Sequence, residues 1–327
     1  MKRLLWLMLV ILGSLCTEPS KKPLVVDPGL LTCVCNSFNR PMQLYAHLKS
    51  VRRHIPELAD INVIYRADKE YDAAYEIVKT AFPEIRFYKQ GVSPSQDYKP
   101  LTMQCAFARR DGYLMFSVDD IIVTHDVNLG LCLRKLEETK TYCIHLRLGR
   151  NIDHCYATRS NRSLATPVPL LKDIGEGMYS WRFGSGRGDW RYQNSMDMAI
   201  YRKADVYEFF NKTPFRNPHF EAAWNGRASD CKRRGLCFDH SQIINIPTNI
   251  VTQYGKNRHA KNGYSPQTLL DKFNEGYEIN IDRFLHVNNR SPHEEHDFEF
   301  IKRCPSSPRA LHSPFGRRLG VATLGFR

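Results

Sequence analysis

The sequence predicts a single large α/β domain, built on a Rossmann-type mixed sheet with flanking helices. Strand-like and helix-like segments alternate through the first third of the 327-residue chain. In the helix-like segments, apolar residues recur every three or four positions, and one strand-like run is apolar over almost its whole length. Alternation at this spacing is typical of parallel, doubly wound sheets with helices on both faces.

The first third of the chain supplies these elements in order. Pro41 is expected in the first turn of a helix, and the stripe Leu44, Leu48, Val51 and Ile55 lies on one face of it. The sequence predicts strands at 30–35, 61–65 and 85–88, and helices at 41–55, 71–82 and 101–110.

The run from Tyr113 to Val123 is the most informative segment. Apolar residues stand on both sides of the carboxylate pair Asp119-Asp120, and a strand without period-two alternation is expected to be buried on both faces. Two ionised carboxylates at the end of a buried strand are costly unless a cation compensates them. A divalent metal that bridges to phosphate oxygens would do so; an exposed pair in an ordinary turn is the alternative.

Two polar segments are expected to meet at one edge of this sheet. The loop Asn36–Arg40 follows the first strand, and Asp119-Asp120 ends another. In open parallel sheets, ligands bind outside the carboxyl ends of the strands. The pattern therefore predicts one ligand crevice between these two segments.

Beyond residue 125 the pattern becomes irregular. A helix is predicted at 129–139 and a strand at 142–148, followed by a loop-rich stretch at 149–195. Its aromatic and glycine-rich part, Trp181–Trp190, is expected either to form a surface platform for a sugar or nucleotide or to be a long loop anchored by its aromatic residues. Residues 304–327 lack periodicity and are predicted to be a disordered basic tail.

The N-terminus suggests export or membrane attachment. A basic start precedes an apolar run, and residues 1–20 are predicted to be a signal peptide or signal anchor. The run is short for a membrane span, which takes about 20 residues. Cys33 and Cys35 are expected on one face of a strand as free thiols, whereas Cys231 and Cys237 are the best disulfide candidates. Mostly free thiols conflict with export, so a cytosolic location is the alternative.

The net charge of +13 favours a polyanionic partner. The basic residues are scattered, and no zinc-finger spacing, RNP-type motif or basic stripe interleaved with aromatics is present. Nucleic acid is therefore not expected as a partner.

The chain resembles bacterial GT-A-type glycosyltransferases of the family-2-like group over about residues 30–303. The resemblance implies a GT-A-like fold with a nucleotide-sugar-binding half at 28–126 and an acceptor and catalytic half at 127–303. It is carried by an ordered series of short motifs: Cys35–Pro41, Phe116–Ile122, Leu146–Asn151, Met196–Arg202, Asn217–Glu221, Ile244–Asn249 and Asn288–His293.

The resemblance implies a metal-dependent transfer of a sugar to a hydroxyl group. Asp119 and Asp120 would hold Mn²⁺ or Mg²⁺, with Asp120 as the likelier direct ligand, and the metal would neutralise the nucleoside diphosphate that leaves. His293 matches a late histidine that completes the metal shell. The family usually has Asp-x-Asp, but here Ser117 stands at the first acid or the acid is displaced, so the group that contacts the ribose is open.

The remaining site residues also follow from the resemblance. Glu221 would be the base that deprotonates the acceptor in an inverting transfer, and Asp197 is the second candidate for this role. A plain first-turn glutamate is the alternative for Glu221. Base, ribose and diphosphate would be bound by Asn36, Ser37, Asn39, Arg40, Arg66, Lys99, Asp119 and Arg147.

The function predicted from the sequence is therefore that of a glycosyltransferase. The partner is a nucleotide-sugar donor, and the acceptor is a glycan, lipid or protein of unknown identity. Two alternatives stay open: a catalytically inactive nucleotide- or glycan-binding protein, and an exported binding lipoprotein.

Overall fold

The first part of the chain alternates strands and helices as predicted. The computed structural model describes residues 24–91, 93–156, 164–226, 232–251, 258 and 263–304. The elements up to the acid pair are η1 (Pro28–Leu30), β1 (Leu31–Phe38), α1 (Pro41–His54), β2 (Asp60–Arg66), η2 (Lys69–Tyr71), α2 (Asp72–Ala81), β3 (Arg86–Lys89), α3 (Pro94–Phe107) and β4 (Tyr113–Val118).

The second part is richer in short strands. It contains β5 (Ile121–Val123), α4 (Leu129–Thr139), β6 (Cys143–Gly149), β7 (His154–Cys155), β8 (Leu164–Ala165), β9 (Lys172–Asp173), β10 (Met178–Arg182), η3 (Phe183–Ser185), η4 (Gly188–Arg191), β11 (Ala199–Arg202), α5 (Lys203–Lys212) and α6 (Phe220–Gly226). The last elements are β12 (Arg234–Phe238), β13 (Ile243–Asn245), α7 (Pro266–Asn274), β14 (Tyr277–Ile279), η5 (Ile281–Phe284) and β15 (Phe300–Lys302).

One large mixed sheet organises the described residues. Its strand order is β3-β2-β1-β4-β11-β6-β12-β10-β9. The strands β3, β2, β1 and β4 are parallel, and β11 runs antiparallel to β4 and β6. The predicted α/β class, with a mixed sheet and flanking helices, is confirmed.

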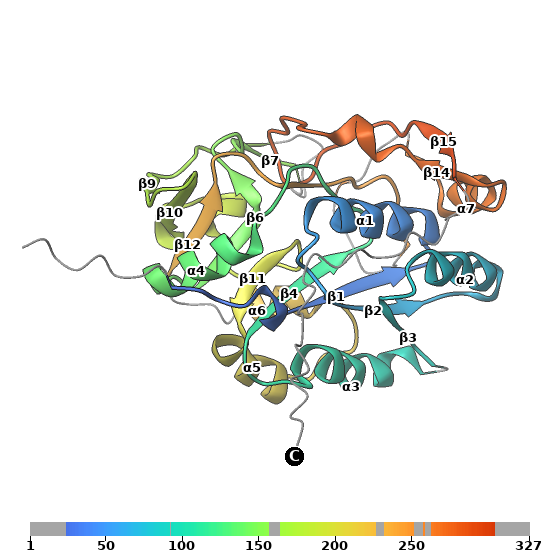
Figure 1. Cartoon of the computed structure of the whole chain (residues 1–327), viewed down its shortest axis with the longest axis horizontal. Helices are drawn as coiled ribbons and strands as arrows, with labels where there is room; N and C mark the ends of the chain where they lie inside the picture. The colour runs from blue at the N-terminus through green and yellow to red at the C-terminus, as the bar shows by residue number, and fades with distance from the viewer. Residues whose placement is uncertain are drawn as a thin grey trace, which may run out of the picture.

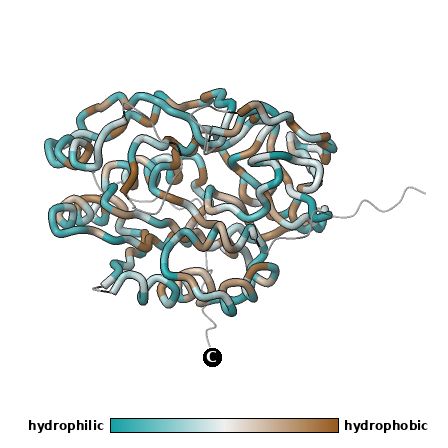
Figure 2. Tube along the Cα trace, turned by 180° about the vertical axis from the view of Figure 1, so that it is seen from behind, coloured by the Kyte–Doolittle hydropathy of each residue, from teal (hydrophilic) through white to brown (hydrophobic). Residues whose placement is uncertain are grey.

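Helices cover both faces of the sheet (Figure 1). The helices α1, α2, α4 and α7 pack into one hydrophobic core, and α3, α5 and α6 pack into a second core on the opposite face. Along β1, Cys33 and Cys35 enter the first core and Val34 the second, because successive side chains of a strand point to opposite faces. Hydrophobic residues accordingly follow the inner strands, while the outer segments are mostly hydrophilic (Figure 2).

The structure corrects two predicted boundaries. The helix expected at 101–110 is α3, which already begins at Pro94 because proline fits the first turn of a helix. The run Tyr113–Val123 is not one strand: Asp119 and Asp120 form a turn, and β5 leaves the large sheet to pair with β13. The turn releases the carboxylates from the sheet and brings the segment after β13 next to them.

The predicted surface platform at Trp181–Trp190 is wrong. Trp181, Phe183 and Trp190 are fully buried, and both indole N–H groups donate to backbone carbonyls. Gly235 makes this packing possible, because a Cβ there would lie 2.6 Å from Trp181 and 2.9 Å from Phe183. The segment runs from the end of β10 through η3 and η4, and its aromatic residues anchor it in the core, as the alternative proposed.

The cysteines in the sheet are reduced, as predicted for Cys33 and Cys35. Cys237 is also a buried free thiol, which contradicts its expected disulfide; Cys231 lies outside the described residues. The targeting segment 1–20 and the tail after Cys304 lie outside them as well. Within the described ranges, no helix has the length and apolar character to span a bilayer.

Candidate active site

The acid pair lies at the end of β4, in the turn before β5. Asp119 is 3% exposed, and its Oδ2 accepts a hydrogen bond from the backbone N–H of Phe38 at 3.2 Å. The Oδ1 atom of Asp120 accepts from Nδ2 of Asn245 at 3.0 Å. Burial raises the pKa of Asp119 to about 6, Arg40 lowers it, and the neighbouring charge of Asp120 raises it.

Arg40 joins the loop after β1 to this pair. Its Nη1 lies 3.1 Å from Oδ1 of Asp119 and 3.0 Å from Oδ2 of Asp120. The other end of the guanidinium donates to the side chain and the backbone carbonyl of Asn249. The predicted convergence of the first loop and the acid pair is thus confirmed.

The polar residues of β1 and its loop are held by neighbouring elements. Asn36 accepts a hydrogen bond from Tyr98 at 2.8 Å, while its Nδ2 has no partner among the described residues. The hydroxyl of Ser37 bonds Tyr75 at 2.6 Å. Asn39 has a φ of 52°, which asparagine tolerates better than most residues, and its side chain pairs with Asp68.

The two outlying predicted nucleotide-binding residues differ in placement. Arg66 ends β2, stacks over the ring of Phe38 and is partly exposed near the loop. Lys99, on α3, donates instead to the carbonyls of Asn211 and Thr213 at the end of α5. The free carbonyl groups at the carboxyl end of a helix attract positive charge. The contacts with α5 therefore explain the position of Lys99 without a bound ligand.

Ser117 does not replace the missing acid of the family motif. It is fully buried within β4, and its hydroxyl contacts Nε2 of His47 at 3.1 Å. Burial lowers the pKa of His47 to about 4, so the ring is neutral at physiological pH. Ser117 and His47 therefore form a buried polar contact inside the core, and Nδ1 of His47 reaches the carbonyl of Ile121 at 2.9 Å.

A second polar cluster lies around Arg147 on β6. Its Nη1 lies 2.6 Å from Oδ1 of Asp189 and 3.9 Å from Oδ2 of Asp197. Nε2 of His293 lies 3.4 Å from the same oxygen of Asp197. Arg147 is 2% exposed, and its Nε and Nη2 have no partner among the described residues. The cluster thus presents unused donors beside carboxylates.

Glu221 borders this cluster from the first turn of α6. Its Oε1 accepts from the backbone N–H of Met196 at 2.8 Å. Burial and then the charge of Asp197 raise the pKa of Glu221 to about 7, whereas Arg147 acts in the opposite direction. A carboxyl group with this pKa can accept a proton near neutral pH, which suits a general base.

The pKa of Asp189 shifts in the opposite direction from that of Glu221. Burial of Asp189 would raise the pKa, but the charges of Arg147 and His293 outweigh this and lower it. The carboxylate therefore stabilises the arginine rather than exchanging protons.

Asn245 connects the two clusters. Its side chain contacts Asp120, and its backbone forms a bridge with His293, next to the N–H···O bond from Asn245 to Pro292. Asp197 lies two residues before β11, the neighbour of β4 in the sheet. Both clusters therefore lie at the same edge of the sheet.

The acid pair suits a hard divalent cation. Its donors are oxygens, and Mg²⁺ is commonly held by one or two carboxylates together with substrate phosphates. The structure brings together Asp119 and Asp120, but the imidazole of His293 contacts Asp197 instead. Within the described part of the chain, no group of three His, Cys, Asp or Glu side chains is arranged to hold a metal. Substrate phosphates and water are the usual source of further oxygen ligands beside such a pair.

Sequence reasoning did not select Asp189, Asn245 and Asn249 as site residues. Asn245 and Asn249 lie in the quoted segment Ile244–Asn249, whose repeated asparagines were the available signal. Asp189 lies between Gly188 and Trp190 and carried no signal, because its contact with Arg147 spans 42 residues.

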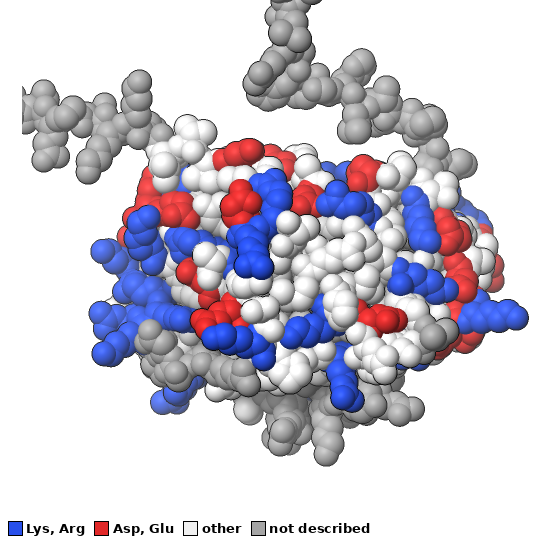
Figure 3. Space-filling model, turned by 90° about the horizontal axis from the view of Figure 1, so that it is seen from below, with Lys and Arg blue, Asp and Glu red and all other residues white. Residues whose placement is uncertain are grey.

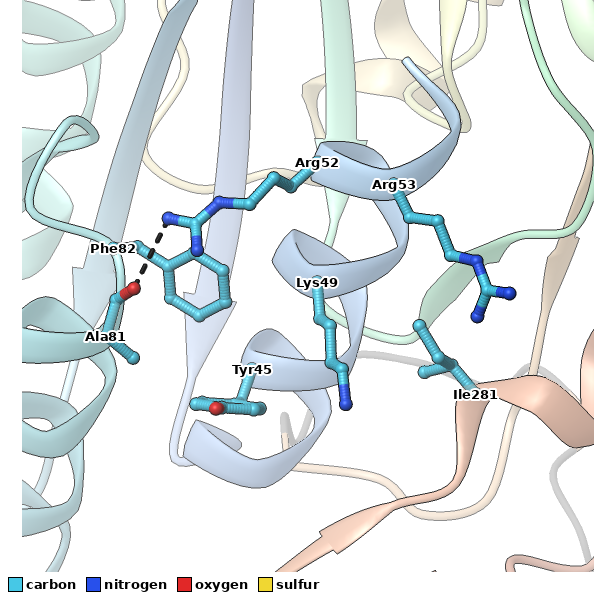
Figure 4. Close-up of a pocket in the computed structure, with 7 residues that line it drawn as sticks. All are labelled: Tyr45, Lys49, Arg52, Arg53, Ala81, Phe82 and Ile281. Carbon is cyan, nitrogen blue, oxygen red and sulfur yellow. Dashed lines mark hydrogen bonds between the residues drawn. The ribbon is translucent and has the colours of Figure 1, made fainter. Parts of the chain in front are cut away.

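A separate cavity of about 290 Å³ lies on the outer side of α1 (Figure 4). Lys49, Arg52 and Arg53 surround it, but each is paired with a carboxylate, from Glu278, Glu84 and Asp282 respectively. Elsewhere, on the face seen from below, Lys and Arg side chains are interspersed with Asp and Glu (Figure 3). Neither surface competes with the two clusters as a candidate site.

No family model matches the chain. The bifunctional glycosyltransferase pgtA of Dictyostelium discoideum is 24% identical over an alignment of 195 residues that covers 54% of this chain. The chain spans 24% of the length of this curated relative. The predicted resemblance to glycosyltransferases is confirmed as a distant similarity.

Solved structures of S. aureus TarS are also similar. The complex of TarS 1-349 with UDP is 13% identical, with a TM-score of 0.43, over 64% of this chain and 57% of that chain. Another TarS structure is 12% identical, with a TM-score of 0.42, over 65% of this chain and 36% of that one. The complex with UDP-GlcNAc is 13% identical, with a TM-score of 0.34, over 55% of this chain and 47% of that one.

Proposed function

We propose that the protein transfers a sugar from a nucleotide-sugar donor to a hydroxyl acceptor, with inversion at the sugar. The observation that carries the proposal is a buried acid pair at one edge of the sheet, which contacts the loop after β1 on one side and is linked through Asn245 to a carboxylate–arginine cluster on the other. Sugar transfer needs these two kinds of site, one for an anionic leaving group and one for the acceptor.

The donor side consists of the loop after β1 and the acid pair. Asn36, Ser37 and Asn39 would bind the nucleoside, and Arg40 and Arg66 supply positive charge for the diphosphate. Asp119 and Asp120 would hold Mn²⁺ or Mg²⁺, which as a Lewis acid neutralises the departing diphosphate when bound.

The acceptor side contains Glu221, Asp197 and Arg147. Glu221 would take the proton from the acceptor hydroxyl, because its raised pKa leaves it basic enough near pH 7. Arg147 has two unused donor atoms for acceptor or donor oxygens. Asp197 and His293 orient one another at the boundary between the two sides.

The N-terminal segment 1–20 supports attachment to a membrane or export as part of this proposal. The first described strand, β1, begins at the edge of the sheet opposite to the acid pair, because the pair lies at the carboxyl end of the parallel neighbour β4.

A panel of nucleoside diphosphates and nucleotide sugars, each with and without Mn²⁺, tests the donor assignment by thermal shift. Stabilisation that needs both the metal and one nucleotide supports the proposal. Absence of a shift with every nucleotide would exclude a transferase and leave the exported binding protein as the explanation.

One observation favours an inactive nucleotide-binding protein as a second candidate: Arg40 already compensates the acid pair. Turnover separates the two candidates. Stabilisation by a nucleotide, without sugar transfer or donor hydrolysis, would identify the inactive protein.

A further inference from the structure

Every carboxylate oxygen of the acid pair already has a partner within the protein. In Asp119, Oδ1 contacts Arg40 and Oδ2 accepts from the N–H of Phe38. In Asp120, Oδ2 contacts Arg40 and Oδ1 accepts from Asn245. The guanidinium of Arg40 therefore occupies one oxygen of each acid, and a metal held by both acids would need these oxygens.

Arg40 is well fixed in this position. Its side chain is 10% exposed. The Nε atom donates to Oδ1 of Asn249 at 2.8 Å, and Nη2 donates to the carbonyl of the same residue. Asn249 in turn donates to the carbonyl of Tyr264 at 2.9 Å. All three nitrogen atoms of the guanidinium are engaged, and the acid pair is thereby connected to the chain around Asn249.

A divalent cation bound to the same carboxylates would lie a few ångströms from the guanidinium. Like charges at this distance repel strongly in a poorly solvated site. Arg40 also competes sterically, because its Nη1 bridges one oxygen from each acid. Metal and guanidinium cannot both use these oxygens without a rearrangement.

We propose that Arg40 and a divalent cation are alternative occupants of the Asp119–Asp120 pair, and that Arg40 leaves the pair when the metal binds. The departing guanidinium is a forked donor that matches phosphate oxygens, so the diphosphate of a donor would favour the exchange. The same movement breaks the contacts with Asn249, which links metal binding to the position of Asn249 and to its hydrogen bond with Tyr264. The inference rests on the proposed function only for the choice of cation.

Direct Mn²⁺ binding tests the exchange, measured by the EPR signal of free Mn²⁺ at pH 8 with the full chain and no nucleotide. Arg40→Gln removes the competing charge and is expected to tighten Mn²⁺ binding by about tenfold or more, since a like charge a few ångströms away is lost. Arg40→Lys retains the charge without the forked geometry and should tighten it less. Arg53→Gln, which changes an exposed arginine in the last turn of α1, is the matched control and should leave Mn²⁺ affinity unchanged.

Asn249→Ala provides a second variant that leaves the acids and Arg40 intact. It removes one of the contacts that hold the guanidinium, so Mn²⁺ should bind more tightly than to the wild type but less tightly than to Arg40→Gln. Unchanged or weaker Mn²⁺ binding in Arg40→Gln, or in Asn249→Ala should Arg40→Gln fail to fold, would overturn the exchange. Sugar transfer is assayed separately: its absence with every nucleotide sugar refutes the proposed function, while the Mn²⁺ titrations still decide the exchange.

Discussion

Replacing Glu221 by glutamine is the sharpest test of the chemistry assigned to the candidate site. The change keeps the shape of the side chain and an oxygen that can accept from the N–H of Met196. It removes the negative charge and the ability to accept a proton. Since general base catalysis contributes about 10²–10⁴-fold, turnover should fall by this factor, about 3–5 kcal/mol in the barrier, while donor affinity stays unchanged.

The pH dependence gives the same test a second readout. Because the pKa of Glu221 is about 7, wild-type turnover should rise with pH and reach half its plateau near pH 7. Asp197→Asn removes a charge that raises this pKa, so the midpoint should move to lower pH. The assay is sugar transfer at saturating donor, from pH 5 to 9.

Stability should respond with a predictable sign. The folded protein holds the Glu221 proton up to about pH 7, whereas the unfolded chain loses it near the ordinary value of 4.5. The contribution of Glu221 to the free energy of unfolding therefore decreases as pH rises from 4.5 to 7. Glu221→Gln should remove this decrease and be more stable than the wild type at pH 8. Near-wild-type turnover in Glu221→Gln, or a loss of donor affinity, would refute the role of base.

Three further changes test other parts of the structure. Asp120→Ala should abolish metal-dependent turnover with an unchanged circular dichroism spectrum; surviving activity would remove the acid pair from the site. Arg147→Met should lower the free energy of unfolding by roughly 3–5 kcal/mol in urea titrations, because it leaves the buried Asp189 unpaired; a loss below about 1 kcal/mol would contradict this pairing. Gly149→Ala places a Cβ 2.3 Å from two backbone atoms and should cost about 3 kcal/mol in the same assay. Gly226→Ala, with nothing within 4 Å, is its control and should be nearly neutral.

The strongly periodic parts of the fold could be predicted from the sequence. The helix expected at 129–139 is α4 with the same bounds, and α1 differs from its prediction by one residue. The predicted end of a strand was wrong where a turn interrupts an apolar run, as at Asp119-Asp120. Hydrophobicity alone does not show where a strand leaves its sheet. The burial of Trp181 was missed because it depends on the empty space beside Gly235, 54 residues away in the chain.

The candidate site divides in the same way. The position of Asp119, Asp120 and Arg40 at one edge followed from the rule that parallel strands end together. The cluster around Arg147 could not be derived from this rule, because Asp189 reaches Arg147 only through the path of an irregular segment of the chain. The placement of His293 against Asp197, rather than beside the acid pair, likewise depends on the bridge to Asn245.

The sequence by itself determined the α/β class, the order of its first elements and the edge of the sheet at which the acids lie. These follow from hydrophobic periodicity and from the chain direction of parallel strands, which are local properties of the sequence. Only the tertiary structure decided that Arg40 compensates the charge of the acid pair. It also decided that burial and the charge of Asp197 raise the pKa of Glu221 to about 7. Charge compensation and desolvation depend on distances between residues far apart in the chain, and these distances exist only after folding.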